Sequence, residues 1–79
     1  MVAVYAIFSE LNGNIYVGMA IDPDRRLKEH NSGKSNFTKK FRPWKTIYRE
    51  MYKDWATART REKYFKTGIG KEFLRSMVP

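Results

Sequence analysis

Residues 2–19 read VAVYAIFSELNGNIYVGM, and this stretch decides the fold. Two runs rich in β-branched and aromatic residues, 2–8 and 14–19, stand on either side of an Asn12-Gly13 pair. Asn-Gly between apolar runs is the strongest short-range signal for a β-hairpin, because both residues tolerate a positive φ. The sequence therefore predicts two antiparallel strands with a turn at residues 11–13.

Each predicted strand carries a tyrosine, Tyr5 on the first and Tyr16 on the second. Side chains alternate along a strand, so the two hydroxyls meet on one face only if the hairpin register brings them there. Such a pair would suit phosphate chemistry. The alternative is that both are ordinary sheet aromatics with solvated hydroxyls.

A helix is expected directly after the hairpin. Asp22 is a good N-cap and Pro23 fits the first helical position, where its missing N–H costs nothing. The helix should run to about His30 and end in residues 31–33, which are Asn-Ser-Gly. Residues 34–43 are basic, polar and interrupted by proline, so we expect a surface loop there, and function often lies on such loops.

The second half of the chain predicts one strand and two helices. Alternating residue types over residues 44–52 indicate a third strand. A helix over residues 55–66 follows an acidic N-cap and places its apolar side chains three or four residues apart. Gly68 and Gly70 are expected to end that helix, and residues 71–77 are expected to form a short last one.

Glu62 lies on the inward side of the helix over residues 55–66, a side it shares with Trp55, Ala58, Phe65 and Lys66. A carboxylate in that place costs desolvation free energy unless a positive group meets it. This position distinguishes Glu62 from the other acidic residues and makes it a candidate functional group.

Length and composition indicate one domain over residues 1–79. The chain has 42% hydrophobic and 15% aromatic residues, enough for a core in a short domain. The absence of cysteine excludes disulfides, zinc-thiolate sites and thiol nucleophiles. The N-terminus has no targeting pattern, and no apolar stretch approaches the ~20 residues that a membrane span needs. We therefore expect a soluble, cytoplasmic protein that does not bind a membrane.

The chain carries 16 Lys and Arg against eight Asp and Glu, a formal net charge of +8. A charge this large implies an acidic partner, and nucleic acid is favoured because no acidic residue lies between Glu29 and Glu50. The alternative is a solvated charged loop. The candidate nucleic-acid-binding residues are Lys34, Lys39, Lys40, Arg42 and Lys45.

The order of these residues resembles that of the GIY-YIG nuclease superfamily over nearly the whole chain, and above all its small stand-alone, single-domain members. The matching positions are the triplets Ala3-Val4-Tyr5 and Tyr16-Val17-Gly18, the helical pair Arg26 and His30, and Glu62. The resemblance implies an α+β fold, in which a small three-stranded antiparallel sheet is flanked by helices in the order β-β-α-β-α-α.

The resemblance also implies hydrolysis of phosphodiester bonds in DNA with one divalent metal ion, Mg²⁺ or Mn²⁺. In that reaction Tyr16 would act as general base or position the water, and Tyr5 would orient water or phosphate. Arg26 would hold the scissile phosphate through its fork of donors. Glu62 would bind the metal, because Mg²⁺ prefers oxygen ligands and retains water. His30 completes the implied catalytic set.

Two of these assignments leave alternatives open. His30 is also placed where a histidine interacts with the negative end of the helix dipole, without any role in chemistry. Arg25 competes with Arg26 for the phosphate, and the spacing from the second tyrosine that is typical of the family selects Arg26.

Three functions are consistent with the sequence. The first is a structure-selective or non-specific DNA endonuclease, and the second is a weakly active or inactive nucleic-acid-binding module of the same fold. The third is a protein-interaction domain that presents the basic loop. Because the chain has no helix-turn-helix or zinc finger to read bases, a protein partner is one possible source of substrate specificity.

The sequence departs from the family pattern at three places. Ala3 replaces the first glycine, and Met19 stands near the place of a lysine that some members use. The asparagine that some nucleases have near the C-terminus has no clear counterpart after Glu62.

Overall fold

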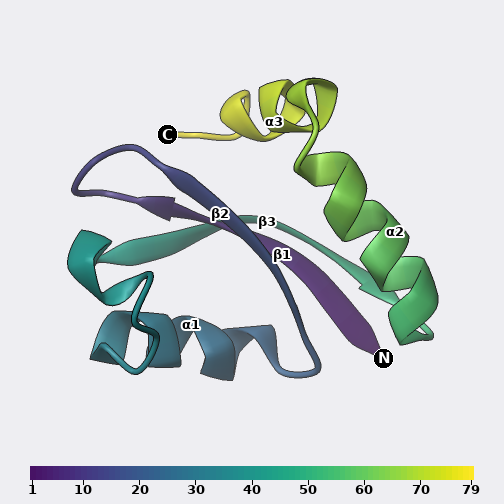
Figure 1. The fold of residues 1–79 in the computed structure, drawn as a ribbon, viewed down its shortest axis with the longest axis horizontal. Helices are drawn as coiled ribbons and strands as arrows, with labels where there is room; N and C mark the ends of the chain where they lie inside the picture. The colour runs from purple at the N-terminus through teal and green to yellow at the C-terminus, as the bar shows by residue number, and fades with distance from the viewer.

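A computed structural model describes residues 1–79 as one three-stranded sheet with helices on both faces (Figure 1). The strands are β1 (Val2–Ser9), β2 (Ile15–Ala20) and β3 (Trp44–Tyr52), in the spatial order β2-β1-β3 with antiparallel pairing throughout. The helices are α1 (Pro23–Ser32), a 3₁₀ turn η1 (Lys39–Phe41), α2 (Trp55–Phe65) and α3 (Gly68–Arg75). The predicted α+β fold and element order are confirmed.

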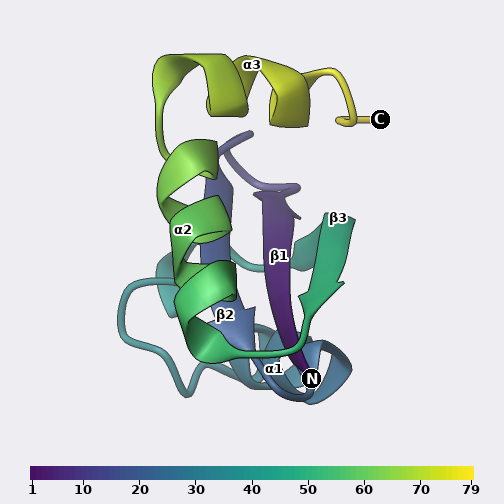
Figure 2. The ribbon, with the colours of Figure 1, turned by 90° about the vertical axis from the view of Figure 1, so that its right-hand side faces the viewer.

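The central strand β1 divides the core into two layers, because its side chains alternate between the faces. Val2, Val4 and Ala6 point toward α2 and α3, where they pack with Phe65 and Leu74 and with two other buried residues. The residues on the opposite face pack under α1 and the loop before β3: Tyr5, Ile7, Ala20 and Trp44. Figure 1 shows α1 and α2 on opposite sides of the sheet, and Figure 2 shows α3 beside the loop end of the hairpin.

The predicted hairpin is present, and Gly13 takes the positive φ, 81°, that its loop requires. Asn12 contributes differently from the expectation, since its φ is not positive; its Oδ1 accepts a hydrogen bond from Asn14 N at 3.0 Å. The Ser9 hydroxyl accepts from the backbone N–H groups of Leu11 and Asn12 at 3.2 and 3.1 Å. Polar side chains therefore stabilise the loop together with the glycine.

Helix α1 begins and ends as its residues predict. The Asp22 carboxylate accepts a hydrogen bond from Arg25 N at 3.0 Å, and Pro23 occupies the first turn. The helix continues to Ser32, and Gly33 caps it in the left-handed conformation. His30 therefore lies in the last turn of α1.

The expected boundary between the last two helices is wrong. Gly68 and Gly70 lie in the first turn of α3 instead of ending α2, and Thr67 is the N-cap, accepting from Gly70 N at 3.3 Å. A side chain at position 70 would overlap the backbone of Tyr64 and Phe65. Gly70 is thus needed for the close approach of α3 to the end of α2, and this tertiary requirement explains a glycine that resembles a terminator in the sequence.

Candidate active site

The hairpin register places both tyrosines on the face of the sheet that α1 covers. Tyr5 pairs with Gly18 and Tyr16 pairs with Ile7, so the tyrosines are diagonal neighbours across β1 and β2. Their ring centroids are 6.5 Å apart. Side-chain alternation alone could not show whether Tyr5 and Tyr16 share a face of the sheet. In the structure they do.

Gly18 makes room for Tyr5. A Cβ at position 18 would lie 2.6 Å from the Tyr5 hydroxyl oxygen, closer than real contacts allow. The Tyr5 ring thus reaches across β2 at the residue that has no side chain, and the tyrosine is only 3% exposed. Gly18, the glycine of the second triplet, therefore allows close packing of the Tyr5 ring and so determines where the Tyr5 hydroxyl lies.

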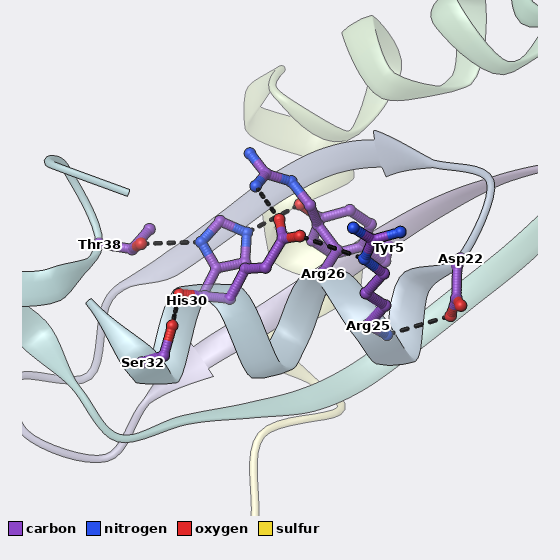
Figure 3. Close-up of polar contacts among 8 residues, drawn as sticks. Tyr5, Asp22, Arg25, Arg26, His30, Ser32 and Thr38 are labelled. Atoms are coloured by element: carbon purple, nitrogen blue, oxygen red, sulfur yellow. Dashed lines mark hydrogen bonds and ion pairs between the residues drawn. The ribbon is translucent and has the colours of Figure 1, made fainter. Parts of the chain in front are cut away.

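Two short hydrogen bonds connect Tyr5, His30 and Thr38 into a chain (Figure 3). The Tyr5 hydroxyl lies 2.9 Å from His30 Nε2, and the Thr38 hydroxyl lies 2.7 Å from His30 Nδ1. Burial lowers the pKa of His30, and the charge of Arg26 acts in the same direction. A neutral imidazole has one donor and one acceptor nitrogen, so the three groups form a directed chain. His30 is thus buried inside the site.

The sequence did not mark Thr38. It stands in the middle of the basic loop, eight residues from its partner His30, and carries no motif. Trp44 holds this part of the loop in place, because its Nε1 donates to the Thr38 carbonyl oxygen at 2.7 Å. Asn31 adds two bonds to the Trp44 backbone, accepting from its N–H at 2.6 Å and donating to its carbonyl at 3.0 Å. Hydrogen bonds of Thr38 and Trp44 to residues of α1 therefore hold the loop against the site.

The two tyrosines differ in their surroundings. Burial and the neighbouring Tyr16 raise the pKa of Tyr5 to about 12, although the charge of Arg26 acts in the opposite direction. Tyr5 is therefore a neutral hydroxyl at physiological pH. Tyr16 is only half-buried; its ring stands edge-on to His30 at 5.1 Å, and its hydroxyl makes no hydrogen bond within the protein. Of the pair, Tyr16 is the one open to a ligand.

Arg26 lies one turn before His30 and is close enough for its charge to act on Tyr5 and His30. Its guanidinium donates to Glu29 at 2.7 Å. Arg25 contacts the other oxygen of the same carboxylate at 3.4 Å, with its side chain largely exposed. Of the two arginines, whose side chains Figure 3 shows beside Tyr5, it is the charge of Arg26 that acts on the tyrosine.

Glu62 approaches the site from α2. Its side chain is 15% exposed and contacts Lys66 Nζ at 3.3 Å and Arg59 Nε at 3.6 Å. The negative charge of Glu62 contributes to the raised pKa of Tyr5, so the carboxylate lies within electrostatic reach of Tyr5, although no hydrogen bond joins the two. Glu62 has the expected inward position and positive neighbours. Trp55 and Lys66, expected on the same side, are instead exposed, because they lie at the two ends of α2.

No group of three or more His, Cys, Asp or Glu side chains is arranged to hold a metal ion. A cation at this site would therefore have Glu62 as its protein carboxylate. That donor set fits Mg²⁺, which commonly binds one or two carboxylates, retains several water molecules and takes further oxygens from substrate phosphates.

The predicted nucleic-acid-binding side chains are exposed, and none forms an ion pair: Lys34, Lys39, Lys40, Arg42 and Lys45. Their loop reaches the site through Thr38. Unpaired positive charge thus lies on and next to the loop that contributes Thr38 to the site. The roles of these cations and of the five catalytic candidates stay predictions.

Comparison with known proteins defines the class to which this fold and site belong. The model of the GIY-YIG catalytic domain matches residues 1–72, and the chain belongs to the GIY-YIG family, whose domain implies a nuclease-type function. No helix is long and apolar enough to cross a membrane.

Within that family the chain is similar to the UPF0213 proteins. Those of Staphylococcus aureus strains Mu3 and Mu50 are each 37% identical over 65 residues, covering 81% of this chain and 79% of theirs. The solution NMR structure of the UPF0213 protein BH0048 from Bacillus halodurans aligns with a TM-score of 0.57 and 30% identity. That alignment covers 98% of this chain and 85% of the other.

Proposed function

We propose that this protein is a DNA endonuclease that hydrolyses phosphodiester bonds, structure-selective or non-specific, with Glu62 holding one Mg²⁺ or Mn²⁺ ion. The observation that carries the proposal is the convergence of Tyr5, Tyr16 and His30 on one face of the sheet, with Arg26 and Glu62 within electrostatic reach. Phosphoryl transfer needs such a set, because a water must be positioned and developing negative charge neutralised.

Tyr16 positions or deprotonates the attacking water, since its hydroxyl is free and partly exposed. Tyr5 is buried and bonded to His30, so it holds the geometry and orients the phosphate side of the site. Arg26 takes a non-bridging phosphate oxygen with guanidinium donors that Glu29 leaves unused. The metal ion, when bound, supplies further positive charge next to the phosphate.

The charge of the chain supports a nucleic-acid substrate. The five unpaired cations of the loop and its neighbours offer phosphate contacts, and such contacts carry no sequence information. We therefore expect recognition of backbone and shape, with any sequence choice supplied by a protein partner.

One observation favours the second candidate, a nucleic-acid-binding module without efficient turnover. Both Glu62 oxygens are engaged by Arg59 and Lys66, at 3.6 and 3.3 Å, and these cations compete with a divalent metal. Met19 and the lack of a late asparagine point in the same direction.

The decisive experiment incubates the purified chain with duplex, single-stranded, nicked and branched DNA in Mg²⁺, Mn²⁺ or EDTA. A nuclease gives metal-dependent products, and Glu62→Ala reduces them at least about 100-fold while binding persists. Glu10→Ala is the matched control, because Glu10 is exposed on the hairpin loop and forms no ion pair. Binding without cleavage by the wild-type chain across the panel would favour the binding module.

A further inference from the structure

A groove opens beside Tyr16, on the outer edge of the sheet and against α3. It consists of two adjoining hollows, of about 250 and 360 Å³, that share Ile15, Val17, Phe37 and Lys71. The larger one includes Tyr16, and the smaller one reaches Arg75. The groove thus leads from the candidate catalytic tyrosine to the positive face of α3.

The walls of the groove combine an exposed aromatic ring with cations. Phe37 is 62% exposed, and its ring centroid lies 5.9 Å from that of Tyr16. Lys71 and Arg75 are exposed and have no carboxylate partner. An aromatic platform beside a positive track is the arrangement by which proteins hold single-stranded nucleic acid, with bases stacked on rings and phosphates on cations.

We infer that the groove takes an unpaired nucleotide adjacent to the scissile phosphate, its base stacked on Phe37 and its backbone following Lys71 and Arg75. The inference rests on the proposed function and names the substrate class, DNA or RNA that is single-stranded at the point of cleavage. The rings of Phe37 and Tyr16 are 5.9 Å apart, so a base stacked on Phe37 would have its own phosphate near Tyr16.

The chemistry of the groove disfavours the other occupants. In a duplex both faces of each base pair are stacked on the neighbouring base pairs, so no base face is free to stack on the Phe37 ring. An apolar protein segment would leave Lys71 and Arg75 unpaired in the contact, which is unfavourable.

Binding in EDTA tests the inference without cleavage. The probes are a fluorescent 12-nucleotide thymidine strand, an abasic strand of equal length and a 12-base-pair duplex. The wild-type chain should bind the thymidine strand roughly 5- to 100-fold more tightly than the abasic strand, because only the former has bases to stack. Phe37→Ala should remove that difference, and Phe37→Trp should restore it.

Two controls separate stacking from charge. Trp55→Ala removes an exposed aromatic that does not line the groove, and it should keep the preference for the thymidine strand. Replacing Lys71 and Arg75 together by Ala should weaken binding of both single strands and lower the salt slope by about 1.4, since each single-strand phosphate contact contributes about 0.7. The same loss of two charges at Lys28 and Lys53, outside the groove, should have a smaller effect.

Each outcome decides a different question. Equal affinity for the thymidine and abasic strands in EDTA would contradict the nucleotide-binding groove. Metal-dependent cleavage of duplex DNA by the same chain, measured separately, would then still support the nuclease. Failure of the wild-type chain to bind any of the three probes would overturn the proposed function itself.

Discussion

Two polar clusters lie on opposite faces of the same sheet, and both contain tyrosines. On the α1 face, Tyr5 and His30 form a chain of neutral groups that ends at Thr38. On the α2 face, Glu50 accepts hydrogen bonds from the hydroxyls of Tyr48 and Tyr52 and from two nitrogens of Arg61, each of the latter at 2.9 Å.

The cluster at Glu50 is saturated. The hydrogen bonds from Arg61 in the first place, and then those from the two tyrosines, lower the pKa of Glu50 to about 2. Arg61 also lies over the rings of Tyr64 and Phe65 at 4.8 and 4.6 Å. The carboxylate of Glu50 accepts four hydrogen bonds, and through Arg61 this cluster joins β3 to α2.

In the cluster at Tyr5, by contrast, not every polar group has a hydrogen-bond partner within the protein. The Tyr16 hydroxyl has no hydrogen-bond partner within the protein, and the charges of Arg26 and Glu62 act on the neighbouring Tyr5. A strongly shifted pKa therefore does not by itself distinguish the candidate site, because Tyr5 in that site and Glu50 in the other cluster both have one. The partly exposed Tyr16 hydroxyl without a partner does distinguish it.

The largest expected effect comes from removing one hydroxyl from each cluster. Tyr16→Phe should reduce DNA cleavage about 100-fold or more, because the water loses its base or its positioning group, and should leave the free energy of unfolding unchanged. Tyr52→Phe should cost about 1 kcal/mol of stability, since it removes a bond to a charged carboxylate, and should leave cleavage unchanged. Cleavage assays and urea unfolding of both variants measure the four quantities. Loss of cleavage in Tyr52→Phe, or of stability in Tyr16→Phe, would contradict the division of roles.

The next effect is on stability alone. Glu50→Gln places an amide N–H₂ among the donors of Tyr48, Tyr52 and Arg61, so the cluster loses a charge-assisted acceptor. We expect a loss of about 2 kcal/mol in urea unfolding at pH 7, reduced from a fully buried pair because Arg61 is partly exposed. DNA binding by the variant should equal that of the wild type.

The same residue predicts a pH dependence of stability. The pKa of the Glu50 carboxyl is about 2 in the folded chain and near its usual value, 4.5, in the unfolded chain. The unfolded chain therefore binds a proton first as the pH falls, and the stability that Glu50 contributes above about pH 5 is lost toward pH 2. Urea midpoints at pH 7, 5 and 3 should fall more steeply for the wild type than for Glu50→Gln. Parallel curves would show that another group controls acid unfolding.

Local signals account for the parts of the fold that the sequence predicts. The Asn12-Gly13 turn, the Asp22 cap and the alternation over residues 44–52 each act within a few residues, and all three elements are present. The positions of the five catalytic candidates came from resemblance to a family, and the register of β1 and β2 explains why two of them meet.

Contacts between distant segments account for what the sequence did not reveal. Thr38 bonds to His30 only because the basic loop folds back on α1, and the cluster at Glu50 joins β3 to α2. Gly70 resembles a helix terminator in the sequence and is instead a point of contact between two helices. A short stretch of sequence does not show which distant residue a side chain will contact in the folded chain.

Gly18 gives the smallest effect and the most direct test of how the site is built. The methyl of Gly18→Ala would lie 2.6 Å from the Tyr5 hydroxyl oxygen, so the phenol must shift, and we expect the shift to disrupt its hydrogen bond with His30 Nε2. The end of one side chain can shift where a backbone cannot, so we expect a modest loss of stability and a loss of cleavage of about 10-fold. The double variant Gly18→Ala with Tyr5→Phe should then cleave no more slowly than Tyr5→Phe alone, because both changes remove the same hydrogen bond. Additive losses would show that Gly18 acts on the backbone of β2 and not through the Tyr5 hydroxyl.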